Sequence, residues 1–229
     1  MKSLRRITVV LASLCLFIVL LLTSFEVAIY GDNEYKFYQK EYEKYQVQEK
    51  LDMEMDDIMY VTEEMMSYLH GEREELSVMV KVEGKQQDFF NDQDRFHMGE
   101  VKVLFLGGLK LRNILACFAV ILFAVALFLK PRKGEMCKTI LATLAGIVCA
   151  LVVIGILCAV NFDAVFVTFH HIFFDNDLWL FDPATDYMIR MLPEGFFFDM
   201  VVRIGMTFAG ALAAVAAGLF LRLWCVKKK

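Results

Sequence analysis

Four histidines are the side chains of this sequence best suited to acid–base chemistry. His70 and His97 stand apart, whereas His170 and His171 directly follow an apolar stretch. An unperturbed imidazole pKa of about 6.5 allows one neutral ring to accept a proton while another donates a hydrogen bond at neutral pH. Two histidines brought together from separate segments could therefore catalyse acyl transfer, one activating a nucleophile and the other acting on an oxyanion or a leaving oxygen.

Other catalytic and metal-binding patterns are weak. The sequence has no GxSxG motif, and Ser77 lies in a predicted strand, so no serine nucleophile is evident. This favours direct acyl transfer without an acyl-enzyme intermediate. HEXXH and related zinc motifs are missing, so a zinc site is a less favoured alternative. Its candidate ligands would be His97, His170, His171 and Asp175. The six cysteines lie in apolar stretches or near basic ends, which argues against disulfides and thiolate metal centres. We therefore expect neither a metal nor a cofactor.

The elements that must position these histidines follow from hydropathy. The chain has 229 residues, of which 58% are hydrophobic and 23% charged, so its charges must be segregated from its apolar stretches. Four apolar runs, at about 7–29, 113–130, 139–161 and 200–221, are long enough to cross a bilayer as helices. The expected fold class is an all-α integral membrane protein with four transmembrane helices and a mostly helical extracellular cap.

Charge predicts the topology. Basic residues gather before the first run, between the second and third runs, and at the end of the chain, namely Lys2, Arg5, Arg6, Lys130, Arg132, Lys133, Lys138 and 227–229. By the positive-inside rule, both termini are expected in the cytoplasm and the two acidic intervening segments outside. The acidic outer face argues against a nucleic-acid partner.

This topology divides the chain into five parts. We predict an N-terminal transmembrane helix over 1–30 and an extracellular cap with a lead-in to the second span over 31–112. Transmembrane helices two and three follow over 113–161, then an extracellular catalytic loop over 162–199. The last transmembrane helix and a basic cytoplasmic tail occupy 200–229.

Within the cap, apolar residues of 51–69 recur at three- and four-residue steps, which predicts a helix that ends at Gly71. Residues 76–82 favour a short strand. Asp92 or Asp94 is expected to cap a further helix that leads to the second span.

The segment between the third and fourth runs interleaves polar and aromatic residues. Its polar residues surround Pro183, which is typical of turns, and Trp179 and Tyr187 suit a membrane surface. A folded re-entrant loop without catalytic residues is one interpretation of this segment. His97, beside an apolar helix stripe, has a similar structural interpretation.

A longer motif in this segment resembles that of a known family. The run FHHIFFDNDLWLFDPATDYMIRMLPEGFF, with FHMGEVK before the second apolar run and YLHG at the helix end, resembles the lipoprotein intramolecular transacylase family Lit. The resemblance covers nearly the whole chain and implies an acyltransferase of the Gram-positive bacterial cell membrane, with its active site on the extracellular side. It implies transfer of the acyl chain from the sn-2 glyceryl ester of a diacylglyceryl-cysteine lipoprotein to the amine of the same cysteine, which gives a lyso-form lipoprotein. Diacylated lipoproteins and membrane lipids are thus the expected partners.

The resemblance also implies the site residues. The two histidines of the family match His97 in FHMGEVK and His170 in FHHIFF. Supporting candidates are His171, Asn176, Asp182 and Glu100, the last standing where the family pattern HMxDV has an aspartate. The candidates for binding the acyl chains are Phe96, Phe169, Phe173, Phe174 and Trp179.

The roles of the two histidines, and the activity itself, have alternatives. We expect His170 to accept the amine proton while His97 stabilises the oxyanion or protonates the leaving glyceryl oxygen, with the reverse assignment as the alternative. A different membrane-lipid acyltransferase or esterase could use the same two histidines. A non-enzymatic, lipid-sensing membrane protein is the alternative from another class, because no standard nucleophile is evident.

Overall fold

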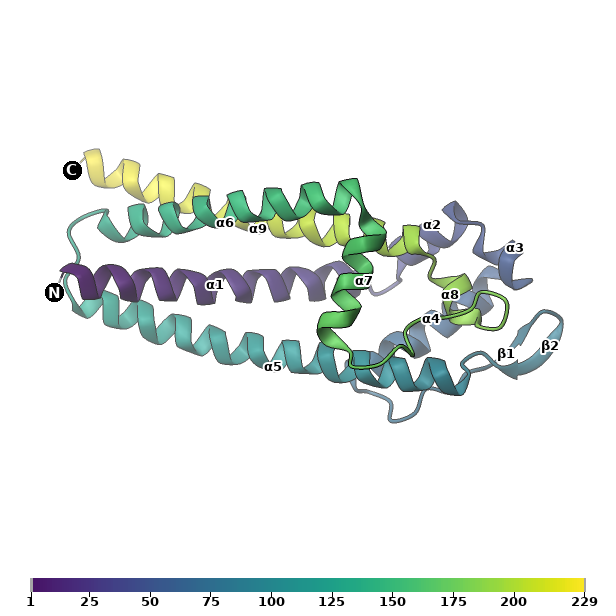
Figure 1. Ribbon diagram of the computed structural model, residues 1–229. Coiled ribbons are helices and arrows are strands. Elements are labelled where there is room, and N and C mark those ends of the chain that lie inside the picture. Colours follow the sequence, from purple (N-terminus) through teal and green to yellow (C-terminus); the bar gives the residue numbers. More distant parts are fainter. Residues whose placement is uncertain (1, 229) are drawn as a thin grey trace. The chain divides into compact units, whose positions relative to one another are not determined.

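The computed structural model of the protein describes residues 2–228 and is dominated by helices (Figure 1). Among these residues, four helices are long and apolar enough to cross a membrane: α1 (Lys2–Tyr30), α5 (Asp92–Phe128), α6 (Glu135–Val160) and α9 (Glu194–Lys228). Each predicted apolar run falls in one of these helices to within two residues. The expected all-α membrane fold with four spanning helices is confirmed.

Shorter elements complete the chain. The helices are α2 (Lys36–Lys44), α3 (Val47–Leu51), α4 (Met55–His70), α7 (Phe162–Phe173) and α8 (Tyr187–Met191). Strands β1 (Met79–Val82) and β2 (Lys85–Asp88) form an antiparallel hairpin in which Val82 pairs with Lys85. The expected strand is therefore shorter than 76–82 and has a partner. The segment expected to be a catalytic loop contains α7, α8 and the first turns of α9, and its only long non-helical stretch lies between α7 and α8.

The chain forms two compact units. The first, which we call the bundle, contains the residues up to Ala28, Leu109–Asn161 and the residues from Arg203 on. The second, which we call the head, contains Ile29–Gly108 and Phe162–Val202. All four histidines belong to the head.

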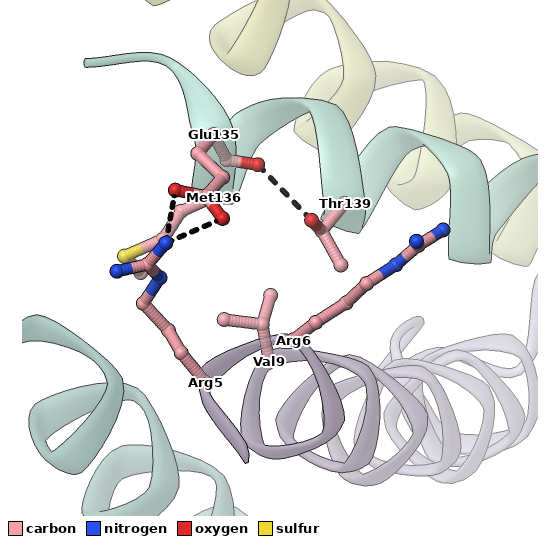
Figure 2. Close-up of a pocket in the computed structure, with 6 residues that line it drawn as sticks. All are labelled: Arg5, Arg6, Val9, Glu135, Met136 and Thr139. Atoms are coloured by element: carbon pink, nitrogen blue, oxygen red, sulfur yellow. Dashed lines mark hydrogen bonds and ion pairs between the residues drawn. The ribbon is translucent and has the colours of Figure 1, made fainter. Parts of the chain in front are cut away.

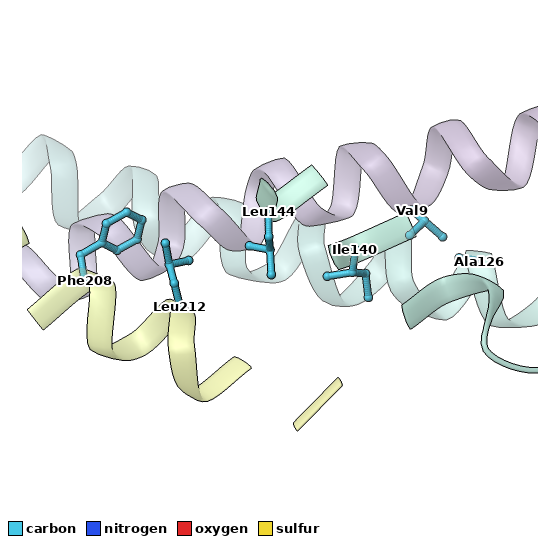
Figure 3. Close-up of a cluster of buried hydrophobic side chains, with 6 residues drawn as sticks. All are labelled: Val9, Ala126, Ile140, Leu144, Phe208 and Leu212. Atoms are coloured by element: carbon cyan, nitrogen blue, oxygen red, sulfur yellow. The ribbon is translucent and has the colours of Figure 1, made fainter. Parts of the chain in front are cut away.

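In the bundle, α1, the C-terminal part of α5, α6 and most of α9 run side by side (Figure 1). A helix pairs all of its backbone polar groups within itself, as a segment surrounded by hydrocarbon must. The buried cluster that joins the helices consists of Val9, Ala126, Ile140, Leu144, Phe208 and Leu212 (Figure 3). Apolar side chains also cover the outside of the bundle, and Phe128, for example, is 86% exposed. A surface of this kind is suited to contact with lipid.

One end of the bundle is fixed by the buried side chain of Arg5. Its guanidinium donates to both carboxylate oxygens of Glu135, at 2.6 and 2.5 Å (Figure 2). It also donates to the carbonyls of Leu129 and Lys130, both at 3.2 Å. Leu129 and Lys130 directly follow the end of α5, so Arg5 fixes the turn after this helix and ties α1 to the start of α6.

The head buries an aromatic core between α2, α4 and the first turn of α9. Tyr42 is fully buried, shares a hydrogen bond of 2.8 Å with the Thr62 hydroxyl, and stacks on Phe196 with ring centroids 6.1 Å apart. Gly195 allows Tyr45 to approach α9, since a Cβ at this glycine would lie 2.5 Å from the tyrosine ring. This core holds the N-terminal turns of α9 in the head.

The end of α4 follows the prediction. Gly71 has φ of 87°, in the left-handed region that favours glycine. Its N–H donates to the carbonyl of Tyr68 and the N–H of Glu72 donates to the carbonyl of Ser67, at 3.1 and 3.0 Å. This paired arrangement satisfies the last carbonyls of the helix and stops it at His70.

The start of α5 differs from the prediction in its capping residue. Asn91, not Asp92 or Asp94, precedes the helix, and its side-chain oxygen accepts from the N–H of Asp94 at 2.9 Å. Asp94 in turn accepts from the N–H of Asn91 at 3.0 Å. This reciprocal pairing satisfies the backbone N–H groups of Asn91 and Asp94. A cap at Asp92 or Asp94 would leave the N–H groups that precede it unpaired.

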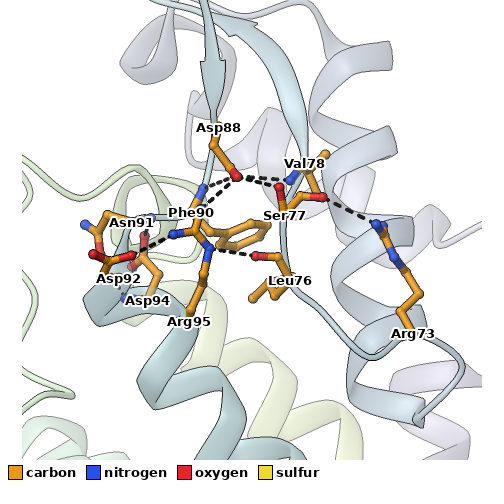
Figure 4. Close-up of polar contacts among 10 residues, drawn as sticks. All are labelled: Arg73, Leu76, Ser77, Val78, Asp88, Phe90, Asn91, Asp92, Asp94 and Arg95. Carbon is orange, nitrogen blue, oxygen red and sulfur yellow. Dashed lines mark hydrogen bonds and ion pairs between the residues drawn. The ribbon is translucent and has the colours of Figure 1, made fainter.

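A second polar network secures the strands to the same helix start. The Asp88 carboxylate accepts from the Ser77 hydroxyl at 2.6 Å, from the Val78 N–H at 3.1 Å and from Arg95 at 2.7 Å (Figure 4). Arg95 also donates to the carbonyl of Leu76 at 3.0 Å. Because Arg95 lies in the first turns of α5, the network fixes the part of the helix that carries His97.

Candidate active site

The structure brings His97 of α5 together with His170 of α7. The two ring centroids are 5.9 Å apart, and the planes are inclined by 30°. Both side chains are buried, at 6% and 7% exposure. The other two histidines are more exposed: His70 pairs with Glu72 at the end of α4, and His171 points elsewhere on α7. Successive residues of a helix diverge in direction, so only one member of the His170–His171 pair can face His97.

The tautomer of His170 is determined by its own helix. Its Nδ1 lies 2.8 Å from the carbonyl oxygen of Phe166, one turn earlier. A carbonyl only accepts, so Nδ1 carries the proton, and Nε2 of the neutral ring keeps a free lone pair. Burial lowers the pKa of His170 below the ordinary histidine value, so the ring is neutral at pH 7.

Aromatic rings enclose His170. Trp179 stacks on it with centroids 4.6 Å apart and planes inclined by 27°, and Phe166 lies at 4.2 Å. Phe174 is 5.5 Å from the same ring. These contacts fix the orientation of the imidazole and exclude water from its faces.

His97 is buried without a hydrogen bond to Nδ1. The nearest carboxylate oxygen, Glu100 Oε2, lies 3.9 Å from Nδ1, which is beyond hydrogen-bond distance, and it too is buried without a partner among the described residues. Phe174 and Phe181 pack edge-on against the ring, at 4.9 and 5.5 Å. Burial, with a smaller contribution from His170, lowers the pKa of His97 to about 4. The site therefore contains two neutral imidazoles.

Two amide side chains attach the segment after α7 to α5. Asn176 donates to Glu100 Oε1 at 2.8 Å and accepts from the N–H of Leu178 at 2.9 Å. Gln93 donates to the carbonyls of Leu178 and Leu180, at 3.0 and 3.1 Å. Asn176 and Glu100 are among the supporting residues predicted from the sequence, but Gln93 is not. Gln93 lies one helical turn before His97, so these two side chains share one side of α5.

Asp182 lies in a turn rather than at the histidines. Its carboxylate accepts from the N–H of Ala184 at 2.9 Å, and its own N–H donates to Asp186 at 2.7 Å. Asp186 also accepts from Asn91 at 2.5 Å, which joins this turn to the start of α5. Asp182 thus folds the segment that carries Trp179, because aspartate readily pairs with the backbone two residues ahead.

The aromatic candidates fall into two groups. Phe174 and Trp179 are buried, both at 5% exposure, and contact His170 directly. Phe96, Phe169 and Phe173 are 52%, 44% and 50% exposed. Phe169 links the groups, since its ring lies 5.5 Å from His170 and 4.7 Å from Phe173. An exposed apolar surface therefore leads up to the buried histidines.

The alternative zinc site is not assembled. Within residues 2–228, no three histidine, cysteine, aspartate or glutamate side chains are arranged to hold a metal ion. Of the ligands considered for zinc, His97 and His170 approach each other, whereas His171 diverges from His170 along α7, and no group of three that includes Asp175 is formed among the described residues.

Similar proteins are known. The in meso structure of the membrane integral lipoprotein intramolecular transacylase Lit from Bacillus cereus matches with a TM-score of 0.81 and 21% sequence identity, over 100% of both chains. A structure of the same protein with a histidine-to-alanine mutation matches with a TM-score of 0.77 and 20% identity, over 100% of this chain and 97% of that chain. At these identities the similarity establishes a shared fold. No curated protein matches the chain.

The family comparison extends beyond fold. The family model described as lipoprotein intramolecular transacylase Lit matches residues 10–197. This range includes most of the chain, both buried histidines and the segments that enclose them. The protein therefore belongs to the lipoprotein intramolecular transacylase family Lit, a family of acyltransferases.

Proposed function

We propose that the protein transfers an acyl chain within one diacylated lipoprotein, from the sn-2 glyceryl ester to the amino group of the lipidated cysteine. The observation that carries the proposal is the pair of buried, neutral imidazoles, of which His170 presents a free Nε2 lone pair. Direct aminolysis of an ester needs a base for the amine proton and a donor for the carbonyl oxygen, and one imidazole can fill each role.

The proposed step conserves protons. The neutral amine attacks the ester carbon, the new C–N bond forms, and His170 Nε2 accepts the amine proton. His97, whose pKa of about 4 keeps it neutral, donates an N–H to the carbonyl oxygen as negative charge develops there. The ester C–O bond then breaks, and the glyceryl oxygen takes the proton from the His170 imidazolium. The lowered pKa of His170 makes that imidazolium a stronger acid than an ordinary protonated histidine and favours this return.

The buried aromatic wall supports an intramolecular reaction. Attack of the amine closes a ring of about eight atoms, through the cysteine, its sulfur and two glyceryl carbons, and medium rings close slowly unless their conformation is imposed. Phe174 and Trp179 form the inner wall beside the histidines, and Phe96, Phe169 and Phe173 offer apolar surface for the acyl chains. Binding energy from the chains can therefore offset the entropy lost when the headgroup folds.

We propose a cell-membrane location with the head on the extracellular side. The basic residues at the opposite ends of the spanning helices, including Lys2, Arg6 and Lys138, support cytoplasmic termini. His97 lies 16 residues before the apolar run that begins near residue 113, outside the stretch expected to cross the membrane. This position in the sequence supports a site at or above the membrane surface.

Mass spectrometry of the N-terminal lipopeptide tests the proposed reaction. A diacylated lipoprotein incubated in detergent with the purified protein should give an isomer of unchanged mass with an N-linked acyl chain. The variants His97→Ala and His170→Ala should abolish product formation, whereas His70→Ala, which changes a more exposed histidine of the head, should not.

Other outcomes identify other activities. Loss of an acyl chain without N-acylation would identify an esterase. Transfer of label from an added phospholipid to the amine would identify an intermolecular acyltransferase. An unmodified lipopeptide, with well-folded protein, would refute the proposed function.

A further inference from the structure

The indole N–H of Trp179 is an unused hydrogen-bond donor inside the site. The side chain is 5% exposed, and Nε1 has no hydrogen-bond partner among the described residues 2–228. An indole nitrogen can only donate, and buried tryptophans usually find an acceptor for it. An unpaired buried donor is costly, so it marks a position where the protein lacks an acceptor that a ligand could supply.

This donor lies beside the proposed base. The indole stacks on the His170 ring at 4.6 Å with an inclination of 27°, while His171 meets it edge-on at 5.3 Å. In the proposed reaction His170 accepts the amine proton, so the ester carbonyl binds beside this stacked pair. The unpaired donor therefore belongs to the ring that stacks on the proposed base.

The position of the indole is fixed before substrate binds. Gln93 donates to both carbonyls that flank Trp179, those of Leu178 and Leu180, at 3.0 and 3.1 Å. Asn176 accepts from the N–H of Leu178 at 2.9 Å. A donor held in this way needs little reorganisation when charge develops, which is the condition for effective oxyanion stabilisation.

We propose that Trp179 is a catalytic residue whose Nε1–H donates a hydrogen bond to the carbonyl oxyanion, as a second donor beside His97. This inference rests on the proposed acyl transfer. No proton moves to or from the indole: the carbonyl oxygen takes up the electron pair when the C–N bond forms and returns it when the C–O bond breaks. Gln93 supports the role by holding the backbone on both sides of the indole.

Kinetics of one conservative variant test the role. Trp179→Phe keeps an aromatic ring against His170 but removes the N–H, so kcat for N-acyl product should fall about 10²–10³-fold, as for loss of one oxyanion donor, with little change in KM. The control is Trp224→Phe, because Trp224 is the other tryptophan of the chain and belongs to the bundle. The thermal unfolding of both variants shows whether the fold is retained.

A second measurement leaves Trp179 intact. The ¹⁵N-labelled Trp224→Phe protein contains a single indole N–H. A lipopeptide analogue with an anionic phosphonate in place of the sn-2 ester should shift this proton signal downfield, whereas an sn-2 ether analogue, which presents no oxyanion, should not.

The outcomes separate this inference from the proposed function. If Trp179→Phe keeps kcat within about threefold of the wild-type value, or if saturating phosphonate leaves the indole signal in place, the donor role is wrong while the acyl transfer stands. If the wild-type protein forms no N-acyl product, the proposed function fails, and the role of Trp179 fails with it.

Discussion

Acidification from pH 7.5 to 5 should destabilise this protein through His97. In the unfolded chain a histidine has a pKa of about 6.5, whereas burial lowers the pKa of His97 in the folded protein to about 4. The unfolded state therefore binds the proton more readily, so stability is fully present above pH 6.5 and is lost as the pH falls towards 4. At pH 5 the loss from His97 alone is about 2 kcal/mol, and it approaches about 3 kcal/mol at pH 4.

Asp94 acts in the opposite direction over the same range. Burial raises the pKa of this carboxyl from 3.8 to about 6, with a further contribution from Asp186. Its folded-state pKa lies above the unfolded value, so protonation below about pH 6 stabilises the folded protein, by about 1 kcal/mol at pH 5. A pH titration of the wild-type protein alone would therefore understate the effect of His97.

Comparison with His97→Gln isolates the effect. Thermal unfolding of both proteins in the same detergent, from pH 7.5 to 5, should give a wild-type Tm that falls more steeply than that of the variant. The excess should be roughly 4–8 °C at pH 5 by the scaling for a chain of this length. Parallel curves would show that His97 is not held neutral by burial, and they would refute the electrostatic basis of its assignment as a neutral donor.

Polar groups elsewhere in the molecule give three further predictions. After division by the fraction of neutral substrate amine, whose pKa is about 7.7–8.0, kcat/KM for N-acyl transfer should fall on the acid side with a pKa below 6.5, because burial lowers the pKa of His170. A corrected limb above pH 6.5 would contradict this. Asn91→Ala should lower the free energy of unfolding by about 1 kcal/mol in thermal or denaturant unfolding, since it removes the cap of α5, and an unchanged stability would contradict the pairing with Asp94. Glu135→Ala should lower the melting temperature by leaving Arg5 buried without a carboxylate, and addition of Arg5→Met should recover part of that loss. A double variant that unfolds at a lower temperature than Glu135→Ala would contradict this reasoning.

The spanning helices were predictable because their signal is strong and local. A run such as 139–161 must form a helix in a bilayer, because only a helix pairs its backbone polar groups within the run. Charged residues on either side set the bounds of the run. Gly71 was equally predictable, since glycine readily adopts the left-handed conformation that ends a helix. Asn91 was overlooked because Asp92 and Asp94 are also good caps, and only the reciprocal bonds select among the three.

The catalytic candidates show where sequence reasoning stops. His97 and His170 could be chosen because of their residue type and motifs, but their 5.9 Å approach depends on the packing of α7 against α5 in the head. The tautomer of His170 required the carbonyl of Phe166, a backbone group that no side-chain motif records. Gln93 was missed for a related reason, since both of its acceptors are backbone carbonyls of a distant segment.

The burial of the two histidines bears on the choice between acyl transfer and hydrolysis. A base able to deprotonate an amine can also activate water, so a transacylase has to keep water from the free lone pair. Trp179 and Phe166 cover the faces of His170, and Phe174 and Phe181 pack against His97. The lone pair of His170 Nε2 lies in the ring plane, so these rings leave its in-plane approach open. In the proposed reaction, the acyl chains of the substrate occupy that approach and bring the amine, rather than water, to the base.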